Sequence, residues 1–264
     1  MDVLHHFGQR DTEVPEVNPD GAPRRFTTDL GYDIELERGY LVIEQVQLVQ
    51  CAGSGAGEAE SALRLLWPRG IAHAHPLGGD PTLLGVPYVD SVLRADFALG
   101  EIGTMQPPPG RYCHARIVVA PADADAVGLP DDVDMVGLSL YLEGTYVAPG
   151  SDQVVPFILE SDDRRELLIP LVDFYNGTPT PLILDDDHRD AHLSLAELTN
   201  FWLDGVQFVG ATQAEETRRA LDAISLTMHH HPGLSQQQLS GRAETWPACA
   251  AGCAAAGPAG APPR

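Results

Sequence analysis

Lysine is absent from this chain of 264 residues, and all sixteen of its cationic side chains are arginines. They are opposed by 38 acidic residues, so the formal net charge is −22 at pH 7. A surface with this excess of acid repels nucleic-acid phosphates and anionic headgroups. The composition therefore excludes a nucleic-acid partner bound through a basic face, and it excludes a polybasic membrane-surface protein.

Long apolar runs and familiar catalytic motifs are missing as well. No run is long enough to cross a bilayer as a helix, so no transmembrane segment is expected. The first residues lack the basic and apolar stretches of a signal peptide. There is no Gly-x-Ser-x-Gly, no His-Glu-x-x-His, no phosphate-binding glycine loop followed by lysine and no Gly-x-Gly-x-x-Gly. These missing motifs lower the expectation of an enzyme.

Glycine and proline are abundant, with 26 and 22 residues, and they divide the chain into short segments. Residues 32–37 and 40–49 alternate apolar and polar side chains with the period of a strand. Further short apolar segments lie at residues 116–120, 137–146, 154–159, 166–171, 182–184 and 205–209. Short apolar segments separated by glycine and proline are typical of all-β folds. We expect a mainly β protein, an antiparallel two-sheet sandwich of the prealbumin or immunoglobulin kind with one to three short helices.

Two segments carry helix signals. Thr212 and Glu215 have capping-box spacing ahead of an apolar stripe that extends to Ile224. Ser194 and Glu197 have the same spacing, which predicts a second, shorter helix over Leu193–Phe201.

The organisation is interpreted as one domain with two loose ends. Residues 1–25 combine prolines and acids without periodicity, which indicates a flexible arm. Residues 26–232 form the β-sandwich domain, since no repeat or change of composition divides them. Residues 233–264 are dominated by Ala, Gly and Pro towards their end and are expected to be disordered.

Four cysteines occur, two at predicted strand ends and two in the tail. Cys51 closes one strand and Cys113 opens another, so a disulfide between them is natural, whereas the alternative is two buried reduced thiols. A disulfide closing a loop of this length contributes roughly 4 kcal/mol and indicates an oxidising compartment. Cys249 and Cys253 have no further ligands nearby in sequence that would complete a zinc site.

Histidine is the residue type that carries the candidate metal site. His73 and His75, and likewise His229 and His231, are separated by two positions, which puts both rings of a pair on one side of an extended strand. Imidazole suits copper and zinc, and two such pairs supply four nitrogens. The alternatives are a polar loop around the first pair and an exposed chain end around the second.

An acidic segment partly follows the pattern of a calcium-binding loop. Its aspartates fall at positions 1, 3, 9 and 12, with a glycine at 6: Asp123, Asp125, Asp131 and Asp134. The sequence predicts no helices on either side of this segment, so the segment is not an EF-hand. An ordinary acidic turn is the alternative to a calcium site. A further acidic cluster consists of residues 185–188 and His192. It is interpreted as a solvated cap beside a helix start, and a mixed carboxylate and imidazole site is the alternative.

Several short sequence segments resemble those of a known group of proteins. They are Ile-Glu-Gln-Val-Gln-Leu-Val at residues 43–49, Gly-Val-Pro-Tyr-Val-Asp at 85–90, Pro-Pro-Gly-Arg-Tyr at 108–112 and Leu-Glu-Gly-Thr at 142–145. Over residues 26–231 the chain resembles the MbnP-like copper-binding proteins, exported bacterial β-sandwiches linked to methanobactin systems. It resembles prealbumin-like lipoprotein domains more weakly. The resemblance implies an extracytoplasmic location, in the periplasm or at the cell surface after loss of a leader, paired cysteines and copper held by histidines.

The expected function is therefore that of an exported, non-enzymatic protein that binds a transition metal for uptake or storage, copper before zinc. A redox or transport protein is the expected partner. One alternative is a surface or periplasmic interaction module without metal. The other is a metal-dependent hydrolase, which needs a general base beside an open metal position.

Overall fold

The computed structural model describes residues 2–8, 21–52, 80–85, 87–94, 100–173, 178–185, 191–198, 201–210, 212–224 and 226–232. These residues form mainly β structure, as the sequence predicts. The first strands are β1 (Asp2–Gly8), β2 (Arg24–Thr27), β3 (Asp33–Gln50), β4 (Leu83–Leu84), β5 (Tyr88–Ser91), β6 (Gly100–Thr104) and β7 (Gly110–Val119). The later elements are β8 (Leu140–Val147), β9 (Val154–Ser161), β10 (Arg165–Asp173), β11 (Leu182–Leu184), β12 (Ala191–Leu198), helix α2 (Gln213–Ala223) and β13 (Leu226–Pro232).

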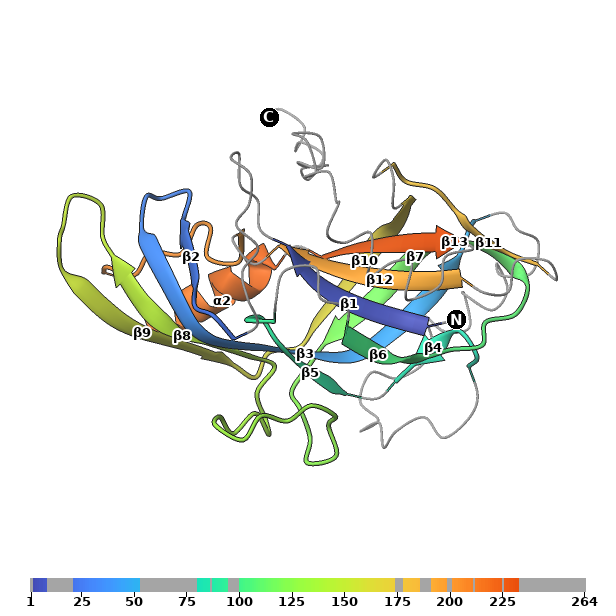
Figure 1. The fold of residues 1–264 in the computed structure, drawn as a ribbon, viewed down its shortest axis with the longest axis horizontal. Coiled ribbons are helices and arrows are strands. Elements are labelled where there is room, and N and C mark those ends of the chain that lie inside the picture. Colours follow the sequence, from blue (N-terminus) through green and yellow to red (C-terminus); the bar gives the residue numbers. More distant parts are fainter. Residues whose placement is uncertain are drawn as a thin grey trace, which may run out of the picture.

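Strand β3 is the longest element and is shared by two strand systems (Figure 1). Tyr40 pairs with both β8 and β5, and Ile43 pairs with both β7 and β5. Because one residue pairs with one neighbour on each side, β8 and β7 follow each other along one edge of β3, and β5 lies on the other edge. Beyond β8 the sheet ends at β9, whereas beyond β7 it continues through β10, β13, β12 and β1 to β6.

The strands form one continuous hydrogen-bonded path. The mainly antiparallel arrangement is confirmed, although β1 pairs with β12 and β10 with β13 in parallel. The structure is an open sheet, and the expected two-sheet sandwich is not confirmed. The reason is that β3 is long enough to pair with β8 along its first half and with β7 along its second half. The sheet also curls, so that a Cβ added to Gly103 of β6 would lie 2.9 Å from Leu84 of β4.

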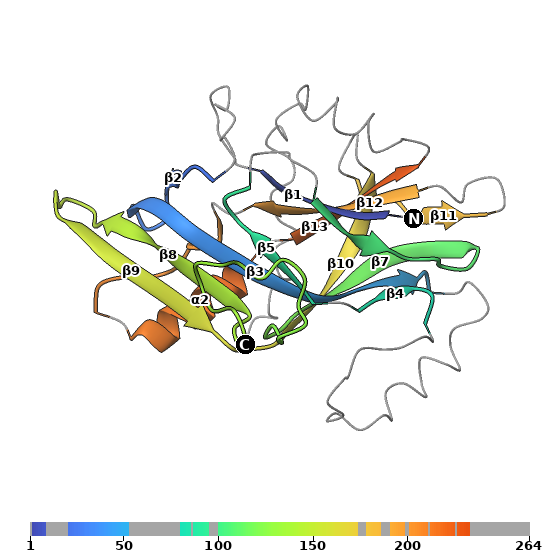
Figure 2. The same cartoon turned by 60° about the horizontal axis from the view of Figure 1, so that its bottom comes forward.

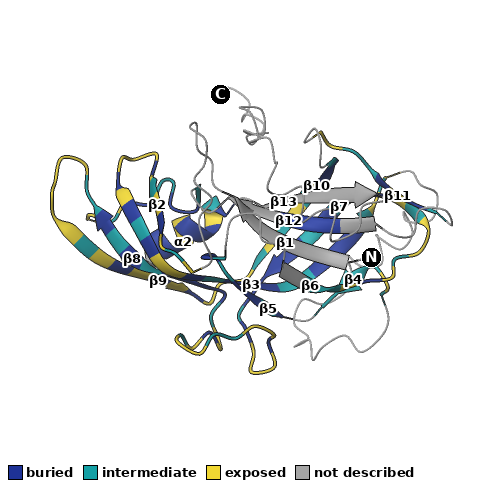
Figure 3. Ribbon diagram, in the orientation of Figure 1, coloured by how far each residue is buried: buried dark blue, intermediate teal, exposed yellow. Residues whose placement is uncertain are grey.

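The main core lies on one face of this sheet and a smaller cluster around Val42, Tyr141 and Met135 lies on the other. Figure 3 shows many buried residues, in dark blue, along β3, β7 and β8. Helix α2 covers one end of the sheet, close to β8 and β9 in both Figure 1 and Figure 2. Its predicted start is confirmed, because the Thr212 hydroxyl accepts from the Glu215 N–H and the Glu215 carboxylate accepts from the Thr212 N–H. Ala220 and Leu221 of α2 are buried in the core.

Two predictions of local structure are wrong. The second expected helix, Leu193–Phe201, is largely strand β12, in which Leu193 and Leu195 are both fully buried. Pairing with β1 and β13 outweighs the capping-box spacing of Ser194, because it buries alternate leucines against the core. The expected strand at residues 205–209 forms turns instead, with Val206 buried.

The expected loose ends lie largely outside the described residues, in particular residues 9–20 and 233–264. Within the expected N-terminal arm, however, Asp2–Gly8 forms strand β1 between β12 and β6. In the described part of the chain, no helix is both long and apolar enough to span a membrane.

Candidate metal site

The disulfide is the sequence-predicted feature that the structure confirms most directly. Cys51 and Cys113 are bonded, with their Cα atoms 4.9 Å apart. Cys51 follows the end of β3, where its N–H donates to the carbonyl of Arg111, and Cys113 lies within β7. The bond thus ties the end of β3 to its neighbour, and structural disulfides of this kind are typical of oxidising environments.

The predicted histidine pairs have different outcomes. His73 and His75 lie outside the described residues, as do Cys249 and Cys253. His229 and His231 lie on strand β13, in the interior of the sheet between β12 and β10. The backbone of the second pair therefore belongs to a hydrogen-bonded strand of the sheet.

The strand register brings a further histidine beside this pair. His231 is directly opposite His192 of the antiparallel strand β12, and His229 is opposite Ser194. Since alternate residues of a strand share a face, and directly opposite residues of two strands do too, His192, His229 and His231 occupy one face of the sheet. Sequence reasoning placed His192 in an acidic cap, and the alternation of Leu193 and Leu195 was the signal for a strand.

The surroundings of His229 in the sheet are sheltered. In register it lies between Ser194 of β12 and Val172 of β10, whose exposed fractions are 1% and 6%. The opposite face of the same strands carries Leu171, Leu193 and Leu195, all fully buried in the core. The described register partners of His229 are therefore buried, and interactions between ligands and an ion are stronger where water is excluded.

Histidine is concentrated in four neighbouring strands, β6, β1, β12 and β13, which we call the histidine strands. They carry six of the ten histidines and none of the sixteen arginines. The six are His5, His6, His192, His229, His230 and His231. The histidine strands are thus rich in imidazole, a ligand type that suits copper and zinc.

The acidic segment gives no comparable support for calcium. Its four aspartates are all exposed: Asp123, Asp125, Asp131 and Asp134. Asp123 accepts a hydrogen bond from the Asp125 N–H at 3.0 Å, and Asp134 accepts one from the Val136 N–H at 3.1 Å. Among the side chains that the structure describes, no three His, Cys, Asp or Glu residues gather as a metal-binding group.

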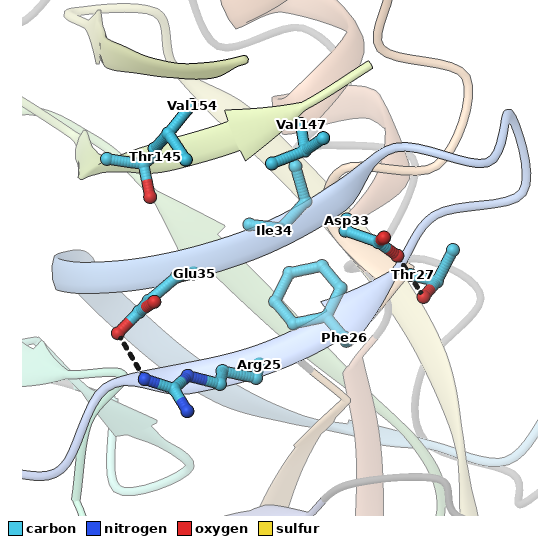
Figure 4. Close-up of a pocket in the computed structure, with 9 residues that line it drawn as sticks. All are labelled: Arg25, Phe26, Thr27, Asp33, Ile34, Glu35, Thr145, Val147 and Val154. Carbon is cyan, nitrogen blue, oxygen red and sulfur yellow. Dashed lines mark hydrogen bonds and ion pairs between the residues drawn. The ribbon is translucent and has the colours of Figure 1, made fainter. Parts of the chain in front are cut away.

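A hollow of about 390 Å³ lies elsewhere, where the hairpin of β2 and β3 meets β8 and β9 (Figure 4). Its polar side chains are paired with one another: Arg25 with Glu35 at 2.8 Å, and Thr27 with Asp33 at 2.7 Å. The hydrogen bond and charge of Glu35 raise the pKa of Arg25. No histidine or cysteine lines this hollow, so it is a poor candidate for a transition-metal site.

Comparison with protein-family models, with curated proteins and with solved structures finds no match for this chain.

Proposed function

We propose that this protein binds a transition metal ion, copper before zinc, and that His192, His229 and His231 are its ligands. The observation that supports this proposal is the register of β12 and β13, which places the three histidines together on one face of the sheet. The site keeps one of the two expected pairs and replaces the other with a single residue of the neighbouring strand.

Strand geometry explains why these positions suit one ion. Directly opposite residues of an antiparallel pair have Cβ atoms about 5 Å apart, and alternate residues of one strand are roughly 7 Å apart. Metal–nitrogen bonds of about 2 Å then allow three imidazoles from such positions to meet at a common point. Imidazole is a ligand of intermediate softness that suits copper and zinc and disfavours calcium and magnesium.

We further propose that the protein acts in metal uptake or storage outside the cytoplasm. The Cys51–Cys113 disulfide supports an oxidising compartment. In this role the protein receives its ion from, or passes it to, a redox or transport partner. The resemblance to MbnP-like proteins favours copper as the first ion to test.

Equilibrium dialysis of the untagged full chain against Cu²⁺ or Zn²⁺, followed by elemental analysis, tests the proposal. The wild type should retain one ion per chain, and the variant His192→Ala/His229→Ala/His231→Ala should retain none. His114→Ala, two strands away on β7, is the matched control and should retain the ion. A wild type without stoichiometric metal would overturn the proposal in favour of an interaction module.

The expectation for His73 and His75 stays a prediction that the same assay can test separately. If they contribute ligands, His73→Ala/His75→Ala should weaken copper retention while leaving the thermal transition of the metal-free protein unchanged. Retention equal to that of the wild type would show that the three histidines of β12 and β13 are sufficient.

A further inference from the structure

Strand β9, the last strand of the sheet, is apolar on both of its faces. Phe157 and Leu159 are buried in the core. The alternate residues Val154, Pro156 and Ile158 lie on the opposite face and are exposed, Val154 by 61% and Ile158 by 44% (Figure 3). The water-facing side of an antiparallel sheet normally carries polar residues. Packing within the chain therefore does not explain the apolar outer side of β9.

Strand β8 extends this surface, because register partners of paired strands share a face. Two of the shared rows carry no charge, and the other two each carry one carboxylate. The rows are Val147–Val154, Thr145–Pro156, Glu143–Ile158 and Tyr141–Glu160. We call this surface the β8–β9 outer face. It combines an uncharged end with an acidic end.

The hollow of about 390 Å³ lies at the uncharged end of the β8–β9 outer face (Figure 4). Thr145, Val147 and Val154 line it, next to the paired side chains of Arg25 and Glu35. The centre of a protein interface typically consists of an apolar side chain that fills such a hollow on its partner. The hollow therefore suits an apolar side chain of another protein.

The charge around this face is negative on β8, on β9 and on the loop before β8. Residues 121–163 carry ten acidic residues and no arginine, lysine or histidine. They also hold four of the eight large apolar side chains that are exposed in the described part of the chain. The loop lies beside the face, because Asp132 is 3.5 Å from Arg38, which also pairs with Glu143 at 3.1 Å. Arg25 and Arg38, from β2 and β3, are each paired with a glutamate.

We infer that the β8–β9 outer face is a docking surface for a partner protein that presents cationic side chains around an apolar one. Protein interfaces have an apolar centre and a polar rim, and complementary charge selects the partner and speeds the encounter. A second copy of this chain fits poorly, because it carries the same negative charge. The inference goes beyond the proposed metal site and does not depend on it, since none of these residues belongs to the histidine strands.

Binding of two synthetic peptides to the untagged full chain, without added metal, tests this inference. One peptide alternates arginine with valine and the other alternates arginine with serine, so they differ only in their apolar side chains. Isothermal titration calorimetry compares the wild type with Val154→Ser/Ile158→Ser and with the matched control Leu168→Ser/Ile183→Ser. Leu168 and Ile183 are 59% and 58% exposed and lie on β10 and β11, which pair with β7. Circular dichroism first establishes that both variants are folded.

The wild type should bind the arginine–valine peptide at one site, and more tightly at low salt than at high salt. Val154→Ser/Ile158→Ser should weaken this binding by about tenfold, because the exposed half of each apolar side chain is buried on binding. The arginine–serine peptide should bind the wild type with a similarly reduced affinity. Leu168→Ser/Ile183→Ser should change the affinity by less than about threefold.

Three results would overturn the inference: no binding to the wild type, equal affinity for the two peptides, or equal affinity of the two double variants. Sedimentation of the chain alone tests the other occupant. Self-association of the wild type that is lost in Val154→Ser/Ile158→Ser would make a second copy the occupant and would also overturn it. Copper retention by dialysis should be the same in all three proteins, so a failure here is distinct from a failure of the proposed function.

Discussion

The two strand systems that share β3 differ in the polar residues that they carry. The wing, which consists of β2, β8, β9, α2 and residues 33–41 of β3, pairs cations with acids. Arg38, for example, lies 3.1 Å from Glu143 and 3.5 Å from Asp132. The histidine strands contain no arginine, and six of their twelve polar residues are histidines, of which the register places His192, His229 and His231 on one face.

This contrast leads us to expect that the residues that stabilise the fold differ from those that bind a ligand. Polar side chains that are matched to each other within the chain have little capacity left for an ion. The histidine strands carry no arginine of their own to pair with, and imidazole suits copper and zinc as a ligand. Substitutions in the wing should therefore lower the free energy of unfolding without affecting metal binding, whereas substitutions of His192, His229 and His231 should do the reverse.

The largest effect on stability is expected at the disulfide, which lies at the end of β3 farthest from the wing. Replacing Cys51 and Cys113 together by Ser should lower the free energy of unfolding by about 4 kcal/mol, because the disulfide closes a long loop in the unfolded chain. Urea denaturation measures this change, and the reduced wild type should behave like the variant. A loss below about 1 kcal/mol would show that the fold does not depend on the bond.

The next largest effect is expected in the wing at Gly144 of β8. A Cβ added there would lie 2.2 Å from the backbone carbonyl oxygen of Glu35, so the paired strands must move apart. Gly144→Ala should lower the free energy of unfolding by between about 1 and 3 kcal/mol and leave metal stoichiometry unchanged. Thr145→Ala, at the half-buried neighbouring position, is the control and should cost less. Loss of metal in Gly144→Ala would break the proposed separation of the two systems.

A smaller effect is expected at the start of helix α2. Thr212→Ala removes the hydroxyl that accepts from the Glu215 N–H and should lower the free energy of unfolding by about 1 kcal/mol. Thr212→Ser keeps the hydroxyl and serves as the control. Thermal and urea unfolding measure both variants, and equal stability of Thr212→Ala and the wild type would show that the cap contributes nothing.

The smallest effect on stability is expected from the half-buried Tyr40 and the buried Tyr141. Burial, followed by the hydrogen bond to Asp132, raises the pKa of Tyr40 to about 12, and burial with the bond to Glu143 does the same for Tyr141. Since the folded-state pKa values are raised, stability is retained below pH 10 and falls as pH rises towards 12.

Spectrophotometric titration should therefore place Tyr40 and Tyr141 among the tyrosines that ionise late, together with Tyr112, whose pKa burial also raises. Asp132→Asn should lower the pKa of Tyr40 but not that of Tyr141, while changing stability at neutral pH by less than about 1 kcal/mol. An unchanged titration curve in Asp132→Asn would show that burial alone sets the pKa of Tyr40.

Local patterns predicted the features that depend on nearby residues. The capping-box spacing of Thr212 identified α2, and the position of Cys51 and Cys113 at strand ends suggested their disulfide. The sequence did not predict that His192 lies beside His229 and His231, because this placement depends on the register of strands that are far apart in the sequence. The same reason explains β1, whose place in the sheet depends on β12 and not on its own composition.

The most direct test of the central claim compares two adjacent residues of one strand. His231 shares a face with His192 and His229, whereas His230 is opposite the fully buried Leu193 and belongs to the other face. Copper stoichiometry is measured by dialysis for His231→Gln and His230→Gln, after circular dichroism has shown that both are folded. We predict that His230→Gln retains one copper ion per chain and that His231→Gln loses it. Equal retention, or equal loss, in the two variants would contradict a metal site set by the register of β12 and β13.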